Sequence, residues 1–252
     1  MHALGRSHVG RVRAVNQDSY GIRVDGPQPH IVVADGMGGH NAGEVASKMA
    51  VDAVMEYMEK TRAENPEKPL SEWLLQSFEY ANRTIFQHAA SHPEQAGMGT
   101  TLIMTLFETD KFWIGHIGDS RGYLLHDGKL KQITQDHSLV QELVRNGQLS
   151  EEEAEHHPQR HILTRALGTD EQVQAEIQEG RWNTEDILVL CSDGLTIHVS
   201  AAEIETILYA EGSLDEKVDT LLELALTRGG HDNITIVAVE NVVLQTERGD
   251  AK

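Results

Sequence analysis

The sequence predicts one α/β domain in which mainly antiparallel sheets are covered by helices. Short apolar runs of strand length alternate in blocks with longer amphipathic segments that begin with helix-capping residues. Tyr123–Leu125 and Leu130–Ile133 flank Asp127-Gly128, and this pattern indicates a hairpin because Asp-Gly suits a type I′ turn. Hairpins favour antiparallel pairing over strict βαβ winding. The predicted strands are His30–Ala34, Thr100–Phe107, Phe112–Ile117, Arg121–Leu125, Ile187–Cys191 and Ile234–Glu240.

Helix starts are marked by side chains that can cap a first turn. Asn41 precedes a run with Val45 and Met49 on one face, and Ser71 opens a second amphipathic run. Three later starts have capping-box spacing, in which a Ser caps the helix and a Glu three residues on returns the hydrogen bond. They are Ser150 with Glu153, Ser200 with Glu203 and Ser213 with Glu216.

The chain is expected to form a single domain over residues 1–245, followed by a short tail at 246–252. Residues 64–69 are predicted to be a loop rather than a domain linker, and no internal repeat is found. The segment 138–161 is polar and helical in pattern. It is flap-like, and its pattern fits either a flap over a site or an unspecialised part of the surface.

Composition is that of a soluble globular protein, with 39% hydrophobic and 24% charged residues among 252. The formal charge of −19 repels nucleic acid and anionic lipid, so we expect neither as a partner. Cys191 is the only cysteine, which excludes an intramolecular disulfide and fits a reducing compartment. No apolar signal segment or membrane span is recognised, so a cytoplasmic location is expected.

Four aspartates each adjoin a predicted apolar strand: Asp35, Asp119, Asp193 and Asp232. In antiparallel sheets the end of one strand adjoins the start of its neighbour, so Asp35, Asp193 and Asp232 are expected to meet on one sheet edge. Clustered carboxylates cannot all ionise without opposing charge. Mg²⁺ and Mn²⁺ prefer such oxygen ligands, and a water held between two such ions becomes a nucleophile.

These motifs also admit other interpretations. Asp-Gly pairs usually mark turns, but Asp35-Gly36 stands among three glycines between a strand and a capped helix, where the Gly36 carbonyl could bind an ion. Walker, dinucleotide-binding and EF-hand patterns are absent. Arg13 could hold two phosphate oxygens or be an ordinary surface arginine. A zinc site is disfavoured because no cysteine set accompanies His156, His157 and His161.

Six ordered motifs together resemble the metal-dependent PPM/PP2C-type protein serine/threonine phosphatases, particularly their short bacterial branch. The resemblance runs from about Gly10 to Val239. A single Asp-Gly pair would say little, whereas six motifs in the family's order are specific. They are Arg13–Asp18, Asp35–Gly39, Gly97–Thr101, Gly118–Arg121, Ser192–Leu195 and Gly230–Asn233.

The resemblance implies an α+β fold, an αββα sandwich of two mainly antiparallel sheets flanked by helices. It implies two tightly bound Mn²⁺ or Mg²⁺ ions bridged by Asp35, with the Gly36 carbonyl on one ion. Asp193 and Asp232 are then expected on the other ion. Asp119, together with Asp193, matches the residues that hold a weaker third ion in bacterial members.

The resemblance also assigns supporting roles. Asp18 is expected to hold metal-bound water from the outer shell, and Arg13 matches the phosphate-binding arginine. Many eukaryotic members have His where Met37 stands, so the proton donor is open between His40 and metal-bound water. Gln17 stands where many relatives have Glu, which removes one charge from the outer shell.

The predicted reaction is hydrolysis of phosphoserine and phosphothreonine in proteins by a metal-bridged hydroxide in a binuclear centre. A covalent phospho-enzyme is not required, and Cys191 is expected to be a core residue. Two alternatives stay open: a non-catalytic module that binds metal or phosphoproteins, and a phosphatase of small phosphate esters. Phosphorylated proteins are the expected substrates, with a cognate serine/threonine kinase as a possible partner, and we expect a monomer.

Overall fold

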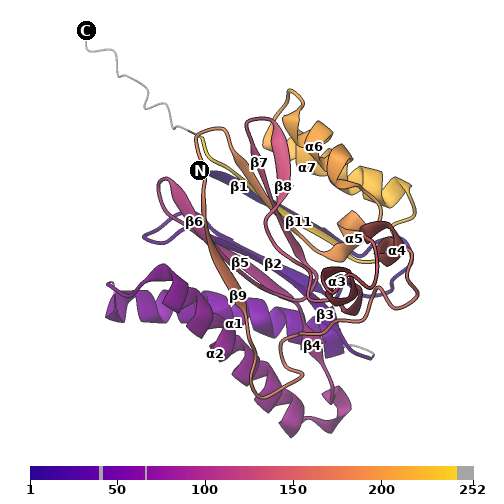
Figure 1. Ribbon diagram of the computed structural model, residues 1–252. Coiled ribbons are helices and arrows are strands. Elements are labelled where there is room, and N and C mark those ends of the chain that lie inside the picture. Colours follow the sequence, from indigo (N-terminus) through magenta and orange to yellow (C-terminus); the bar gives the residue numbers. More distant parts are fainter. Residues whose placement is uncertain (40–41, 66, 243–252) are drawn as a thin grey trace.

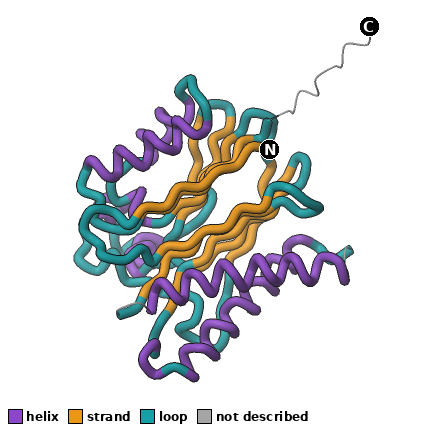
Figure 2. The backbone as a smooth tube through the Cα atoms, turned by 180° about the vertical axis from the view of Figure 1, so that it is seen from behind, coloured by secondary structure: helices purple, strands orange, loops and turns teal. Residues whose placement is uncertain are grey.

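A computed structural model describes residues 1–39, 42–65 and 67–242. Two antiparallel sheets lie face to face, and helices cover both outer faces (Figures 1 and 2). The predicted αββα sandwich is therefore confirmed. His40 and the predicted tail at 246–252 lie outside the described residues.

Each sheet brings together strands from distant parts of the chain. The first sheet has the order β1 (His2–His8), β11 (Ile234–Glu240), β10 (Ile187–Cys191), β7 (Arg121–His126) and β8 (Lys129–Gln132). The second has the order β2 (Asp18–Arg23), β3 (His30–Met37), β5 (Leu102–Phe107), β6 (Lys111–Ile117) and β9 (Glu176–Arg181), and the short β4 (Gly99–Thr100) also pairs with β3.

The long helices divide between the two outer faces. α1 (Ala42–Glu64) and α2 (Leu70–Ser91) cover the second sheet, while α6 (Ala201–Tyr209) and α7 (Leu214–Thr227) cover the first. The shorter elements are η1 (Pro93–Gln95), α3 (Leu139–Arg145), α4 (Glu151–Glu155) and α5 (Asp193–Thr196).

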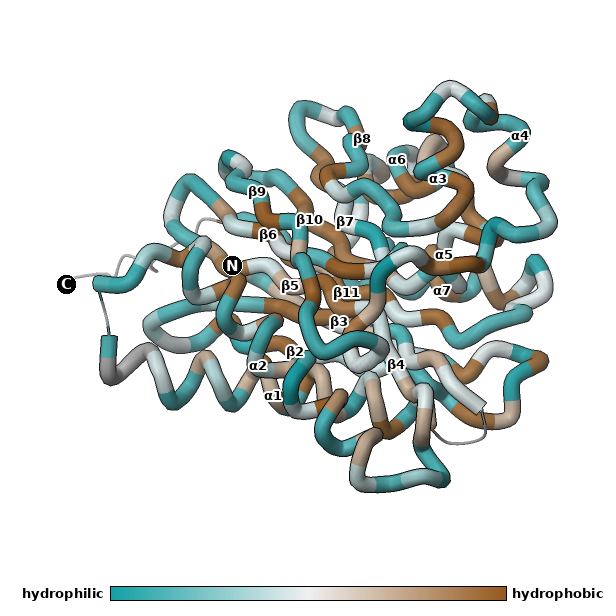
Figure 3. Tube along the Cα trace, turned by 60° about the horizontal axis from the view of Figure 1, so that its bottom comes forward, coloured by the Kyte–Doolittle hydropathy of each residue, from teal (hydrophilic) through white to brown (hydrophobic). Residues whose placement is uncertain are grey.

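Alternating side chains on the strands build three apolar layers. On β3, Ile31 and Val33 enter the layer between the sheets, whereas Val32 and Ala34 join the layer under α1 and α2. Figure 3 shows the apolar residues concentrated along the inner strands. Each fully buried aliphatic side chain stabilises the fold by about 1.5–3 kcal/mol, so these layers hold the strand ends in fixed positions.

The local signals read from the sequence are largely confirmed. All three predicted capping boxes form, at Ser150, Ser200 and Ser213. Asp127 and Gly128 both have positive φ, at 49° and 72°, as a type I′ turn between β7 and β8 requires. Asp-Gly thus marks a turn there, as expected.

Three strands were not predicted: β1, β2 and β9. All three are edge strands. An edge strand has one neighbour and often an exposed face, so it lacks the continuous apolar run by which the inner strands were recognised. α2 begins at Leu70 after Pro69, one residue earlier than predicted. The predicted strand at Thr100–Phe107 is two strands, β4 and β5.

The polar segment 138–161 contains α3 and α4, which confirms its helical pattern. Its ends are joined by a single antiparallel bridge between Ser138 and Leu163. Among the described residues, no helix combines the length and the apolar character needed to cross a bilayer.

Candidate functional site

The predicted aspartates meet where strand ends of the two sheets adjoin. Asp18 begins β2 and lies opposite Asp35 in β3, within the second sheet. Asp193 begins α5 two residues after the end of β10, and Asp232 lies two residues before the start of β11, so both adjoin strands of the first sheet. The prediction of a single sheet edge was therefore wrong, because β3 pairs with β2 and β5 rather than with β10 or β11. The site is built across the end of the sandwich.

The backbone of Asp35 is fixed by two threonines. Its N–H donates to Thr101 Oγ1 at 2.9 Å, and its carbonyl accepts from the Thr101 N–H and from Thr100 Oγ1, each at 2.9 Å. Thr101 Oγ1 is in turn 2.7 Å from Ser120 Oγ. Three hydrogen bonds to one residue leave Asp35 little freedom to move.

Five carboxylates share this space and perturb one another. Burial first, and then the charges of Asp18, Asp193, Asp119 and Asp232, raise the pKa of Asp35 well above its ordinary value. Burial, with further repulsion from neighbouring aspartates, raises the pKa of Asp18 to about 7, of Asp119 to about 8 and of Asp193 to about 6. Positive charge relieves the repulsion among these carboxylates, so the cluster favours the binding of cations.

The donor atoms of the cluster fit a hard divalent cation. Asp18 Oδ2 accepts a hydrogen bond from Ser192 Oγ at 2.8 Å, while Asp18 Oδ1 is buried with no hydrogen-bond partner among the described residues. A buried unpartnered acceptor is costly unless a cation or an ordered water satisfies it. In the part of the chain that the structure describes, no three of these carboxylates place ligand oxygens within 4.8 Å of one another, so three of them can share one ion only if their side chains move closer together.

Two glycines allow α1 to approach β3 beside Asp35. A Cβ on Gly36 would lie 1.9 Å from the Gly43 carbonyl oxygen, and a Cβ on Gly43 would lie 2.7 Å from the Gly36 carbonyl oxygen. The Gly36 N–H donates to the Gln17 carbonyl at 3.0 Å. Neither glycine can therefore be replaced without displacing the backbone next to the cluster.

Arg13 forms an ion pair with one aspartate of the cluster. Its Nη2 lies 2.7 Å from Asp232 Oδ2, its side chain is about half exposed, and this hydrogen bond raises its pKa. Asn233 holds the loop that carries Arg13, because its Nδ2 donates to the Val9 carbonyl at 2.9 Å and to the Val15 carbonyl at 3.0 Å. The guanidinium is thus held at the edge of the carboxylate cluster.

Known proteins share both the sequence and the fold. A sequence profile of the family described as protein phosphatase 2C matches residues 4–231. The chain belongs to the protein phosphatase 2C family. The serine/threonine phosphatase stp of Listeria welshimeri is 43% identical over 249 residues, which cover 98% of this chain and 99% of that protein.

Solved structures agree with this assignment. The serine/threonine phosphatase PstP/Ppp of Mycobacterium tuberculosis matches with a TM-score of 0.87 at 39% identity, over 96% of this chain and 99% of that one. The catalytic domain of PstP in complex with two manganese ions matches with a TM-score of 0.84 at 38% identity, over 96% of this chain and 98% of that one. This protein is a metal-dependent protein serine/threonine phosphatase.

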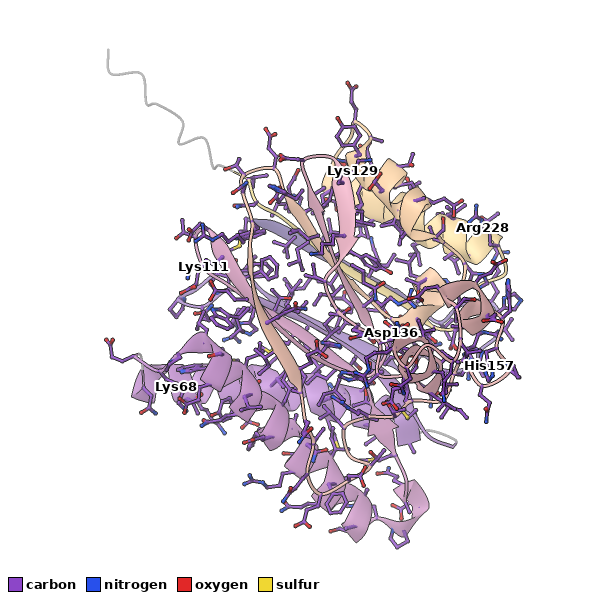
Figure 4. All side chains as sticks on the ribbon, in the orientation of Figure 1. Lys68, Lys111, Lys129, Asp136, His157 and Arg228 are labelled. Atoms are coloured by element: carbon purple, nitrogen blue, oxygen red, sulfur yellow. The ribbon has the colours of Figure 1, made fainter. Side chains whose placement is uncertain are left out.

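The phosphatase fold brings most of the predicted site residues together. Seven meet at the end of the sandwich: Arg13, Asp18, Asp35, Gly36, Asp119, Asp193 and Asp232. The eighth, His40, lies outside the described residues. His157 lies at the rim of the molecule, as Figure 4 shows.

Supporting residues were missed by sequence reasoning. Ser192, Thr101 and Asn233 each hold one part of the site, and the only available signal was that they stand next to a predicted ligand or in a matched motif. Cys191 is buried, and burial raises the pKa of its thiol to about 12. It is a core residue, as predicted, and at neutral pH it carries no thiolate for a cysteine-phosphatase reaction.

Proposed function

We propose that this phosphatase removes phosphate from phosphoserine and phosphothreonine in proteins at the five-aspartate cluster. The observation that carries the proposal is the convergence of the five carboxylates across the two sheets, with the pKa of Asp35 raised by burial and by the other four. Divalent cations stabilise such a cluster in its ionised form.

The carboxylates would form two neighbouring sites for tightly bound ions and one separate site for a weaker ion. Asp35 and the Gly36 carbonyl would hold one tight ion, Asp35 with Asp193 and Asp232 the other, and Asp119 with Asp193 a weaker third. Asp35 would be the ligand common to both tight ions, since each of the other four aspartates lies close enough to repel its charge. When bound, Mn²⁺ or Mg²⁺ lowers the pKa of water enough to supply the attacking nucleophile at neutral pH.

Asp18 orients water at the site rather than binding an ion directly. Its Oδ2 is occupied by the Ser192 hydroxyl, which leaves the unpartnered Oδ1 to accept from a water. Ser192 is itself fixed, because its Oγ accepts from the Thr235 N–H at 3.0 Å. Asp18 is therefore held in one orientation by the first sheet while its backbone belongs to the second.

Arg13 binds the phosphate. One nitrogen, Nη2, is engaged by Asp232, and the half-exposed guanidinium has further N–H donors for phosphate oxygens. A net charge of −19 repels an anionic substrate from the molecule as a whole, so a local cation is needed for binding. Arg13 also stabilises negative charge on the phosphoryl oxygens during the reaction.

His40 is kept as a candidate proton donor to the leaving oxygen, and the segment 138–161 as a flap that contributes to specificity. We propose a monomeric cytoplasmic enzyme that opposes a serine/threonine kinase. The stp and PstP relatives, both named serine/threonine phosphatases, support the substrate class.

The direct test compares two substrates and two metal states. Metal-stripped enzyme is assayed on an aryl phosphate and on a phosphothreonine peptide, with and without Mn²⁺. We expect hydrolysis of both only with metal, and a higher kcat/KM for the peptide. Hydrolysis of small esters with no peptide turnover would instead favour a small-molecule phosphatase, and inactivity on both would favour a non-catalytic binding module.

A further inference from the structure

His137 connects the flap-like segment to the residue that precedes Asp119. The His137 N–H donates to the Gly118 carbonyl at 2.9 Å, and the Gly118 N–H donates to His137 Nδ1 at 3.2 Å. Gly118 has a φ of +100°, a conformation that few other residues adopt. Two hydrogen bonds with one histidine therefore fix the peptide units on both sides of Gly118, the second of which leads directly into Asp119.

The same histidine stands at the root of the flap-like segment, which is the place where residues 137–139 lie beside residues 162–164. The Thr164 N–H donates to the His137 carbonyl at 2.9 Å, and the Leu139 N–H donates to the Ile162 carbonyl at 2.9 Å, so the two ends of the segment are joined there. Ser138 then caps α3 through Gln141. A displacement of the flap-like segment would therefore strain these hydrogen bonds first.

The residue before His137 is also held. Asp136 accepts from Arg121 of β7, with Nη2 at 2.7 Å from Oδ2 and Nε at 3.0 Å from both carboxylate oxygens. The Asp136 side chain is only 11% exposed, and Figure 4 labels it near the middle of the view. The root is thus tied to β7 on one side and to Gly118 on the other.

The protonation of His137 suits its role as an acceptor. Burial, with the nearby His116 and Arg165, lowers the pKa of His137 to about 4, so the ring is neutral at physiological pH. Its Nδ1 lone pair accepts from Gly118, which places the proton on Nε2, 3.5 Å from Glu176 Oε2.

The neighbouring histidine packs against this ring rather than completing a metal site. Donor atoms of His116, His137 and Glu176 do lie within 4.8 Å of one another. However, the two rings are stacked, with centroids 4.6 Å apart and planes 16° from parallel, so their in-plane lone pairs run side by side and do not converge. His116 Nε2 also donates to the Gln135 carbonyl at 2.7 Å, which fixes the ring in place.

We propose that His137 is a positioning residue that sets the affinity of the third ion at Asp119 by holding Gly118, and so links that ion to the flap-like segment. This inference rests on the proposed role of Asp119 as a ligand of the weaker ion. His137 itself touches neither substrate nor ion in this account.

Two substitutions separate the contacts of the two ring nitrogens. His137→Asn places an amide oxygen near the position of Nδ1 and keeps an acceptor for the Gly118 N–H. His137→Gln reaches toward the position of Nε2 and loses that acceptor. Ion binding is measured directly, by following free Mn²⁺ with electron paramagnetic resonance, alongside kcat as a function of Mn²⁺ concentration.

We expect His137→Gln to weaken the third ion by roughly 10- to 100-fold, as loss of supporting hydrogen bonds does at other metal sites. The two tight ions and the melting temperature of the loaded enzyme should remain close to those of the wild type. His137→Asn should bind the third ion nearly as the wild type does. The reverse ranking, or unchanged third-ion binding in both variants, would overturn the proposal.

Asp119→Ala separates this inference from the function on which it rests. If Asp119→Ala loses the weak ion while His137→Gln keeps it, the inference is wrong and the ligand assignment stands. If Asp119→Ala keeps the weak ion, the ligand assignment itself is wrong. Should His137→Gln fail to fold, Ser138→Ala loosens the same root by removing the α3 cap; it should weaken the third ion by a smaller factor, and unchanged binding would refute the link.

Discussion

Arg13 and Asp232 form an ion pair of 2.7 Å between Nη2 and Oδ2, which joins the loop before β2 to the residue that leads into β11. The arginine is half exposed, so solvent screens the pair and its net contribution to stability is small. The pair instead positions a guanidinium at the edge of a carboxylate cluster. Loss of Arg13 should therefore affect substrate binding more than folding.

Arg13→Ala is expected to raise KM for a phosphothreonine peptide and for an aryl phosphate by roughly tenfold or more, the value of a charge-assisted hydrogen bond. kcat should fall less, because the guanidinium binds phosphate in the ground state as well as in the transition state. Arg23→Ala is the matched control, since Arg23 also forms an exposed ion pair, with Glu59, at the far end of β2. An unchanged KM for Arg13→Ala would make it an ordinary surface residue.

Asp35→Asn should lower kcat by at least ~10²-fold, because it removes charge from the carboxylate assigned to bridge both tight ions. Steady-state turnover at saturating Mn²⁺ measures the effect, and Asp193→Asn should behave similarly. Asp127→Asn is the control, since Asp127 belongs to another Asp-Gly pair that forms an exposed turn. Near-normal turnover by folded Asp35→Asn would remove Asp35 from the metal site.

Metal-free protein should become less stable as pH rises. Burial and mutual repulsion raise the folded-state pKa of Asp18 to about 7 and of Asp119 to about 8, from an ordinary value of 3.8. Between those values the folded state binds more protons than the unfolded state, so the free energy of unfolding falls with increasing pH. This stabilisation is complete below the ordinary pKa and is lost as pH passes the folded-state pKa.

Thermal melts at about pH 7.5 and about pH 8.5 test this prediction, since histidines, whose ordinary pKa is about 6.5, are mostly neutral in the unfolded state over that range, and the buried ones with lowered pKa values are neutral in the folded state as well. The melting temperature of the metal-free protein should be lower at the higher pH. Mn²⁺-loaded protein should show a smaller decrease, because the ions neutralise the carboxylates. Equal pH dependence with and without metal would contradict a metal-binding cluster.

Asp119→Ala should leave the two tight ions and the fold in place while lowering kcat by about 10²-fold, the scale of a lost proton-transfer contribution. Asp119 stands in the β6–β7 turn, apart from the paired β2 and β3 that carry Asp18 and Asp35. Calorimetry of Mn²⁺ binding and turnover at saturating Mn²⁺ are the measurements. Loss of the tight ions would place Asp119 in the central site, and normal turnover would make it a structural turn residue.

The ligands could be predicted because each stands at a boundary between an apolar strand and a polar loop. Asp193 after β10 and Asp232 before β11 were placed correctly on adjacent strands of one sheet. Asp35 was assigned to the wrong sheet, because strand boundaries carry no information about which strands pair. The edge strand β2, which presents Asp18 opposite Asp35, has too few apolar residues to show in the sequence.

The supporting hydrogen bonds could not be predicted from the sequence. Thr101 contacts Asp35 across 66 residues, and Ser192 contacts Asp18 across 174, so only the folded chain brings them together. His137 lies 19 residues from Gly118, directly before the polar segment 138–161, and no motif marked it. Their roles depend on the register between strands, which a pattern of apolar and polar residues does not specify.

Metal dependence is the most direct test of the account as a whole. Enzyme stripped with a chelator should release no phosphate from a phosphothreonine peptide, and titration with Mn²⁺ or Mg²⁺ should restore turnover. The added metal should also raise the melting temperature, because it relieves repulsion among the five aspartates. Full turnover in metal-free buffer would contradict the proposed mechanism.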